Sequence, residues 1–280
     1  MQSVETVAEM RGVVANARAN GKSIAFVPTM GALHDGHLTL VDEAKRMADI
    51  VVMSIFVNPL QFGPSEDFDR YPRMLGEDSK LAEGRGVDFV FAPTKEDMYP
   101  EHAPVVIVHP GSIGKEWEGA VRPHHFEGVL TVVAKLFNVV MPDVAVFGQK
   151  DLQQVACIKA MVRDLNFAVG IHVVPILRDP DGLAMSSRNR YLSAKDRELG
   201  LKLSKALFAM REAFAKGERR ASALEAIGWR MLERVTGLTP RYLAAVNADT
   251  FQRVNTVRHG DAAVGAVRVG ETKLIDNIIF

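Results

Sequence analysis

Two histidines lie three residues apart at the end of the sequence PTMGALHDGH, residues 28–37, between an apolar run and a helical pattern. The first amides of a helix have no partner within the helix and readily bind phosphate. Gly31 and Gly36 let the backbone come close to a ligand, and His34 and His37 add donors that change charge near pH 7. The segment therefore indicates phosphate binding, with two capping histidines or a metal-binding pair as alternative interpretations.

A second polar cluster, FGQKDLQQ at residues 147–154, follows another apolar run. Ligands of open parallel sheets gather beyond the carboxyl ends of the strands. Lys150 is a mobile cation suited to phosphate oxygens, and Gln154 can hold hydroxyl or carboxylate oxygens without adding charge. The alternative is a plain turn with a solvated lysine.

A third cluster, DGLAMSSRNR at residues 181–190, begins with the turn signal Asp-Gly. Ser186 and Ser187 supply hydroxyl donors, and the fork of Arg188 suits a polyanion. We favour a functional loop here over a surface loop. Ser193, just downstream, is instead expected to cap the next helix.

A fourth cluster, FVNPLQFG at residues 56–63, places Asn58 and Gln61 at the end of a further apolar run, where both could face one pocket. The segment GSIGKE, residues 111–116, has neither the glycine spacing nor the Ser/Thr of a phosphate loop, and we expect a turn there. The chain also lacks the pattern GxGxxG, so dinucleotide oxidoreduction has little support.

The elements that must position these clusters follow from hydrophobic periodicity. Long apolar runs predict strands buried on both faces, and they alternate with helical spacing, which indicates a parallel sheet with right-handed crossovers. Up to residue 178 we expect helices over residues 3–20, 36–49, 77–85, 126–141 and 151–165, and strands over residues 23–28, 50–57, 87–91, 105–108, 144–147 and 171–177.

The pattern changes after about residue 180. We expect two charged amphipathic helices, then strands whose alternation is typical of antiparallel pairing. The helices cover residues 194–216 and 220–235, and the strands cover residues 241–246, 262–269 and 273–279. The sequence therefore predicts an α/β domain over residues 1–178 and a smaller α+β domain over residues 179–280.

Composition narrows the class of protein. The 280 residues include 34 Lys and Arg and 34 Asp and Glu, so the formal net charge is zero. A general binder of nucleic acid or membrane surfaces would need a basic excess. Cys157 is the only cysteine; it falls in an apolar helical pattern and is expected to be a buried structural thiol. No targeting pattern is recognisable in residues 1–5 and no apolar run reaches membrane-spanning length, so a cytoplasmic enzyme is expected.

These segments together resemble the pantoate–β-alanine ligase family of the HxGH nucleotidyltransferase superfamily. The matching sequences are PTMGALHDGH, SIFVNPLQFG, DFDRYPR, RPHHFEGV, VFGQKDLQQ and DGLAMSSRNRYLS, in the family's order between residues 28 and 193. HxGH alone is shared across the superfamily, whereas the set of six is specific. One departure is Leu60, where the family often has methionine, a change that conserves volume.

The resemblance implies a Rossmann-like domain followed by a smaller domain, usually in a homodimer. It also implies a two-step ligation with ATP and Mg²⁺. The carboxylate of (R)-pantoate attacks the α-phosphorus of ATP to give pantoyl adenylate and pyrophosphate. The amine of β-alanine then displaces AMP from the acyl carbon to give pantothenate.

The resemblance further implies roles for individual residues. His34, His37, Lys150 and Arg188 would be catalytic, with His37 the proton donor, and Gln61 and Gln154 would bind pantoate and β-alanine. Tyr71, Glu77, Asp78 and Arg122 are weaker candidates; one or both of the two carboxylates would meet magnesium or the β-alanine amine. The residues expected to bind ATP are Met30, Gly31, Ala32, Leu33, His34, Asp35, Gly36, His37, Gly148, Gln149, Lys150, Asp151, Leu177, Met185, Ser186, Ser187 and Arg188.

Two other functions compete with this interpretation. An adenylyltransferase of the same superfamily would share the histidine pair but would not need Gln61 and Gln154. A non-catalytic nucleotide-binding module would bind ATP without turnover.

Overall fold

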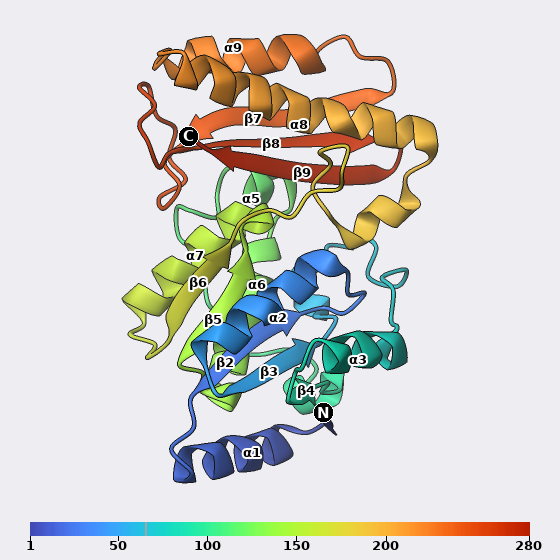
Figure 1. Ribbon diagram of the computed structural model, residues 1–280, viewed down its shortest axis with the longest axis vertical. Coiled ribbons are helices and arrows are strands. Elements are labelled where there is room, and N and C mark those ends of the chain that lie inside the picture. The colour runs from blue at the N-terminus through green and yellow to red at the C-terminus, as the bar shows by residue number, and fades with distance from the viewer. Residues whose placement is uncertain (65) are drawn as a thin grey trace. The chain divides into compact units, whose positions relative to one another are not determined.

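The computed structural model describes residues 1–64 and 66–280 (Figure 1), and the chain divides into two compact units. The first unit comprises residues 1–148 and 157–174, and the second comprises residues 149–156 and 175–280. The second unit thus begins four residues before the predicted limit at residues 178/179 and includes a short earlier segment. The predicted domain limits stay a prediction.

The first unit is built on a six-stranded parallel sheet in the order β1-β4-β3-β2-β5-β6. Such a sheet needs a crossover after each strand, which the alternating sequence pattern predicted. The strands are β1 (Gln2–Val4), β2 (Ile24–Thr29), β3 (Ile50–Ile55), β4 (Phe89–Phe91), β5 (Val144–Gly148) and β6 (Gly170–Val174).

Helices cover both faces of this sheet (Figure 1). The helices up to β6 are α1 (Val7–Ala19), α2 (Asp35–Met47), α3 (Leu75–Gly84), α4 (Lys95–Met98), α5 (Glu118–Val121), α6 (His125–Val140) and α7 (Leu152–Asp164), with 3₁₀ turns η1 (Pro59–Gln61) and η2 (Gln149–Asp151). The first turn of α7 and all of η2 belong to the second unit.

Strand β2 shows why an unalternating apolar run is central in the sheet. Successive side chains point to opposite faces, and both faces of β2 are buried. Val27 joins the cluster beneath α2, which includes Val41. Phe26 points the other way and meets Phe137 of α6 edge to face, with ring centroids 6.5 Å apart.

The second unit contains an antiparallel sheet of β7 (Leu238–Val246), β8 (Ala262–Val269) and β9 (Thr272–Ile279), in that order. Helices α8 (Ala194–Ala215) and α9 (Ala221–Leu232) pack on one face of it (Figure 1). The core between them includes Leu207, Met210, Leu224, Leu243 and Leu274. The fold class is confirmed: a Rossmann-like parallel-sheet unit and a smaller α+β unit.

One predicted strand is wrong, one predicted helix begins later than expected, and two local expectations are confirmed. Residues 2–4 form strand β1, so helix α1 begins only at Val7, after a Thr6 cap. Residues 105–108 form no strand; they lie in a loop that bends at residues 105 and 106. Ser193 caps α8 by accepting the Asp196 amide at 3.1 Å. Cys157 is buried, and burial raises the pKa of its thiol to about 12.

No helix among the described residues is both long enough and apolar enough to cross a membrane.

Candidate active site

The loop between β2 and α2 has an unusual backbone that a buried carboxylate holds. Gly31 and Ala32 have φ of 79° and 51°, a conformation that disfavours side chains with a Cβ. Asp78 of α3, which is 2% exposed, accepts the amides of Ala32 and Leu33 at 2.9 and 2.8 Å. An added Cβ on Gly31 would lie 2.8 Å from Asp78 Oδ2. The backbone conformation of the loop thus brings both amides to Asp78, and the Asp78 carboxylate stabilises that conformation.

The two histidines cap the helix that follows this loop. His34 Nδ1 accepts the Gly36 amide at 3.1 Å, and His37 Nδ1 accepts the His34 amide at 3.4 Å. The ring centroids are 4.1 Å apart. Because each Nδ1 accepts a hydrogen bond, a neutral ring carries its proton on Nε2. The pair therefore presents its donors at Nε2.

The backbone amides of this loop have internal partners, and the expectation that they bind phosphate stays a prediction. The amides of Ala32 and Leu33 donate to Asp78, and the Gly36 amide donates to His34. A phosphate would compete with strong internal acceptors for these three N–H groups. The capping interpretation and the phosphate interpretation of the histidines are thus compatible, because Nδ1 caps the helix and Nε2 is the donor.

Gln61 lies in η1 beyond the end of β3, and both the oxygen and the nitrogen of its side-chain amide are hydrogen-bonded. Asn58 Nδ2 donates to Gln61 Oε1 at 3.1 Å, and Gln61 Nε2 donates to Met30 Sδ at 3.0 Å. Asn58 is 1% exposed and also accepts the hydroxyl of Tyr99 at 2.9 Å. Asn58 therefore orients Gln61, and two predicted site residues, Met30 and Gln61, meet.

Helix α6 approaches the Gln61 backbone closely through Gly128. A Cβ at Gly128 would lie 2.3 Å from the Leu60 carbonyl oxygen and 2.6 Å from the Gln61 nitrogen. At such distances the backbones would have to separate. Asn58 Nδ2 joins the two segments by donating to the Gly128 carbonyl at 3.1 Å.

A network of charged side chains also holds the backbone carbonyl of Gln61. Arg122 Nη2 and His125 Nδ1 bond the Gln61 carbonyl at 3.2 and 2.8 Å, and Arg122 Nη1 lies 3.0 Å from His125 Nε2. The guanidinium forms a forked pair with Glu66, at 2.5 and 2.7 Å. Burial and the Arg122 cation lower the pKa of His125 to about 4. Neutral His125 therefore donates to Gln61 and accepts from Arg122.

The weaker candidates thus fall into different environments. Arg122 acts through Gln61 and Glu66, and Asp78 holds the Gly31 loop, so neither needs a substrate to explain its burial. Tyr71 is buried against Phe62, with ring centroids 5.9 Å apart. Glu77 is exposed on α3. Their predicted substrate or magnesium contacts stay predictions.

In the second unit, residues 175–188 form a loop whose two segments fold back on each other. Leu177 accepts the Met185 amide at 3.0 Å, which brings the predicted adenosine and phosphate residues together. Ser186 Oγ accepts the Arg188 amide at 3.2 Å and so begins η3 (Ser187–Tyr191). The loop therefore presents residues 185–188 as one partly exposed segment.

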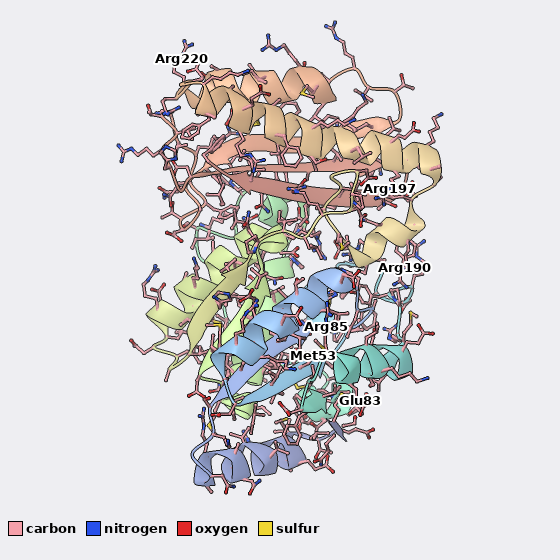
Figure 2. All side chains as sticks on the ribbon, in the orientation of Figure 1. Met53, Glu83, Arg85, Arg190, Arg197 and Arg220 are labelled. Atoms are coloured by element: carbon pink, nitrogen blue, oxygen red, sulfur yellow. The ribbon has the colours of Figure 1, made fainter. Side chains whose placement is uncertain are left out.

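Arg197 of α8 anchors the same loop (Figure 2). Its guanidinium bonds Asp179 at 2.7 Å and Asp181 at 2.8 and 2.9 Å. These hydrogen bonds lower the pKa of the Asp181 carboxyl. Arg197 therefore stabilises the loop, a role that the sequence analysis did not assign to it.

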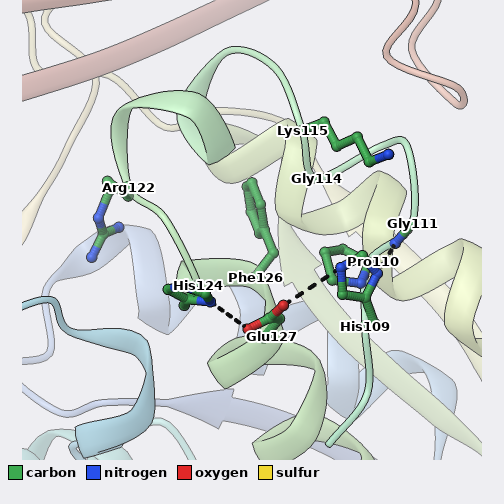
Figure 3. Close-up of a pocket in the computed structure, with 9 residues that line it drawn as sticks. All are labelled: His109, Pro110, Gly111, Gly114, Lys115, Arg122, His124, Phe126 and Glu127. Carbon is green, nitrogen blue, oxygen red and sulfur yellow. Dashed lines mark hydrogen bonds and ion pairs between the residues drawn. The ribbon is translucent and has the colours of Figure 1, made fainter.

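A separate small pocket lies at the start of α6 (Figure 3). Glu127 lies between two histidines there, 2.7 Å from His124 Nδ1 and 3.5 Å from His109 Nε2. The predicted turn at residues 111–116 is confirmed and forms part of the wall. Of the predicted residues, only Arg122 lines this pocket.

Each unit thus assembles its own share of the predicted site. Among residues 1–64 and 66–280, no group of three or more His, Cys, Asp or Glu side chains is arranged to hold a metal ion. The first unit holds residues 30–37, Gln61 and Gly148; the second holds Gln149, Lys150, Asp151, Gln154, Leu177, Met185, Ser186, Ser187 and Arg188.

Comparison with known proteins places the chain in a family. The family model described as pantoate-beta-alanine ligase matches residues 2–279. Pantothenate synthetase 1 of Bradyrhizobium diazoefficiens is 49% identical over 100% of this chain and 98% of its own length. This full-length match favours the ligase over the adenylyltransferase alternative.

Solved structures agree with this match. Pantothenate synthetase from Thermus thermophilus superposes with a TM-score of 0.94 at 46% identity, covering 100% of this chain and 99% of that one. The pantoate-beta-alanine ligase of Francisella tularensis, solved with beta-gamma ATP and beta-alanine, gives a TM-score of 0.80 at 32% identity, covering 100% and 97%. The chain belongs to the pantoate–β-alanine ligase family.

Proposed function

We propose that this chain catalyses the reaction of its family, the ATP-dependent condensation of (R)-pantoate with β-alanine. In the first step a pantoate carboxylate oxygen bonds to the α-phosphorus of ATP, and pyrophosphate leaves. In the second step the β-alanine nitrogen bonds to the acyl carbon, AMP leaves, and the nitrogen loses a proton. Family membership over residues 2–279 supports the reaction.

The histidine pair is the observation that carries the proposed mechanism. The first transition state gathers negative charge on phosphate oxygens, so fixed donors should contribute most to catalysis. His34 and His37 have Nδ1 held by backbone amides and Nε2 protonated in the neutral ring. Two such donors, fixed at the start of α2, stabilise the nucleotide phosphates, and His37 is the proton donor.

Cations and hydroxyls of the second unit are the further groups that we assign to the nucleotide phosphates. Lys150 and Arg188 balance the triphosphate charge, and Ser186 and Ser187 donate hydroxyl hydrogen bonds. Magnesium, which the family resemblance implies, would neutralise part of the phosphate charge when bound together with ATP. Leu177 borders the adenosine.

Gln61 and Gln154 bind the small substrates. The Gln61 side chain is fixed by Asn58 and Met30, and its backbone by Arg122 and His125. A neutral amide fixed in this way can bond the pantoate hydroxyls without changing the local charge. Gln61 also helps to place β-alanine.

A homodimer in the cytoplasm completes the proposal. Val105, Val106 and Ile107 are consecutive apolar residues with exposed fractions of 96%, 82% and 50%. An apolar run this exposed is typical of an interaction surface, here with a second copy. Light scattering should give the mass of a dimer, and Val105→Asp with Val106→Asp should give a monomer.

Isotope exchange tests the reaction. The chain should exchange labelled pyrophosphate into ATP only when pantoate is present, and product analysis with β-alanine should show pantothenate and AMP in equal amounts. Exchange without pantoate would indicate a different acceptor. Tight ATP binding without any exchange would indicate a nucleotide-binding module, and either result would refute the proposed function.

A further inference from the structure

The C-terminal strand β9 carries two adjacent buried polar residues, Asp276 and Asn277, which sequence analysis did not single out. Both hold segments of the second unit that carry predicted site residues. Successive side chains of a strand point to opposite faces. Asp276 therefore shares the helix-covered face with Leu274, and Asn277 lies on the other face.

The Asn277 side chain holds the turn that contains Lys150. Its Nδ2 donates to the carbonyl oxygens of Gln149 and Lys150, both at 3.0 Å. Its Oδ1 accepts Gln149 Nε2 at 2.9 Å. Both amide hydrogens of Asn277 are thus bonded to the backbone of η2, and the residue is 2% exposed. A carboxamide is required here because only it combines two adjacent donors with an acceptor at this size.

Asp276 holds the other segment through Arg178. The guanidinium forms a forked pair with the carboxylate at 2.7 and 2.8 Å and donates to the Asn277 carbonyl at 3.2 Å. It also lies 4.8 Å from the ring centroid of Phe208. Arg178 directly follows Leu177, so this pair ties the start of the predicted nucleotide loop to β9.

The charge of Lys150 interacts with the Asp276 carboxylate of this strand. Burial raises the pKa of the Asp276 carboxyl, while the Arg178 and Lys150 cations act in the opposite direction. The Lys150 side chain is 24% exposed and lies 3.7 Å from Asp151. Asn277 therefore fixes the backbone of Lys150, and the ammonium group of Lys150 lies near the Asp151 carboxylate.

We propose that Asn277 is a positioning residue, which acts on the adenylation step by fixing the backbone of Lys150. This inference rests on the proposed role of Lys150 in phosphate binding. A displacement of about 1 Å in a catalytic group can lower a rate on the order of 100-fold. Loss of the two Asn277 donors should therefore slow adenylation without removing Lys150.

Asn277→Asp is the direct test, because it keeps the size of the side chain and replaces two donors by an oxygen facing two carbonyls. Pantoate-dependent exchange of pyrophosphate into ATP should fall about 10- to 100-fold, with the KM for pantoate within about twofold of wild type. Asn255→Asp makes the same change at an exposed position of the same unit and should leave exchange unchanged. Thermal unfolding checks that each variant is folded at the assay temperature.

A double-variant cycle separates positioning from general damage. Lys150→Ala should lower exchange about 100-fold, and adding Asn277→Asp should then lower it by less than about twofold. Multiplication of the two effects would refute the inference, as would normal exchange in folded Asn277→Asp. Gln149→Ala, which removes only one hydrogen bond, is a milder second variant and should show a smaller loss.

The outcomes also separate this inference from the proposed function. Absence of exchange in the wild-type chain would refute the function itself. Normal exchange in Lys150→Ala would remove Lys150 from the catalytic set and refute the inference with it. A defect in Lys150→Ala without one in Asn277→Asp would refute only the role of Asn277.

Discussion

Replacing Asp78 by asparagine should loosen the loop that carries the histidine pair. The carboxylate accepts the amides of Ala32 and Leu33 at 2.9 and 2.8 Å in a buried site. Asparagine keeps one acceptor and turns an NH₂ group toward the other amide. A hydrogen bond to a charged group contributes about 1.5–3 kcal/mol, and an unsatisfied buried donor costs about 1–3 kcal/mol.

These terms overlap, so we expect the free energy of unfolding of the first unit to fall by about 2–4 kcal/mol. The φ of 51° at Ala32 should relax once its amide is released. Because His34 directly follows this loop, pantoate-dependent exchange should also fall by about 10- to 100-fold.

Urea unfolding followed by tryptophan fluorescence measures the stability change. The chain has two tryptophans, Trp117 in the first unit and Trp229 in the second. A Trp229→Phe background therefore reports the unit that contains Asp78. Glu96→Gln makes the same carboxylate-to-carboxamide change at an exposed position and is the control.

Two results would refute this reasoning about Asp78. A stability loss below about 0.5 kcal/mol, the range of ordinary surface substitutions, would mean that the carboxylate does not hold the loop. Lost exchange with unchanged stability would instead support the predicted contact of Asp78 with magnesium or the β-alanine amine.

Three further predictions follow from the packing. Gly128→Ala should lower the free energy of unfolding by about 1–3 kcal/mol through overpacking against the Leu60 carbonyl, measured in urea, and a neutral result would contradict the close approach. The pKa of His125 is lowered to about 4, so the contribution of His125 to the free energy of unfolding is full above about pH 6.5 and is lost as the pH falls toward 4, with a total of up to about 3 kcal/mol. The variant His125→Gln should therefore show a weaker loss of stability in acid than the wild-type chain. An unchanged loss in this variant would rule out His125 as its source. Cys157, whose thiol pKa burial raises to about 12, should react with a disulfide reagent only after denaturation, whereas rapid reaction in the native state would contradict its burial.

The nearly continuous apolar runs of β2, β3 and β5 were predicted because a strand buried on both faces leaves a local pattern. Strand β1 was missed because its three residues carry no such pattern and are ordered by pairing with β4. Residues 105–108 have strand composition, but composition does not supply a neighbouring strand. Helix α2 was predicted together with its histidines because the caps are local.

The chemistry of the site follows the same division. The sequence by itself determined which candidate residues the site offers, since His34, Gln61, Lys150 and Arg188 each lie in a short motif that can be read locally. Tertiary structure decided how these groups are held. Asp78 reaches the loop from 46 residues away and Asn277 reaches Lys150 from 127 residues away. A buried carboxylate or amide is satisfied by whichever backbone groups the fold brings to it, and local sequence cannot specify those partners.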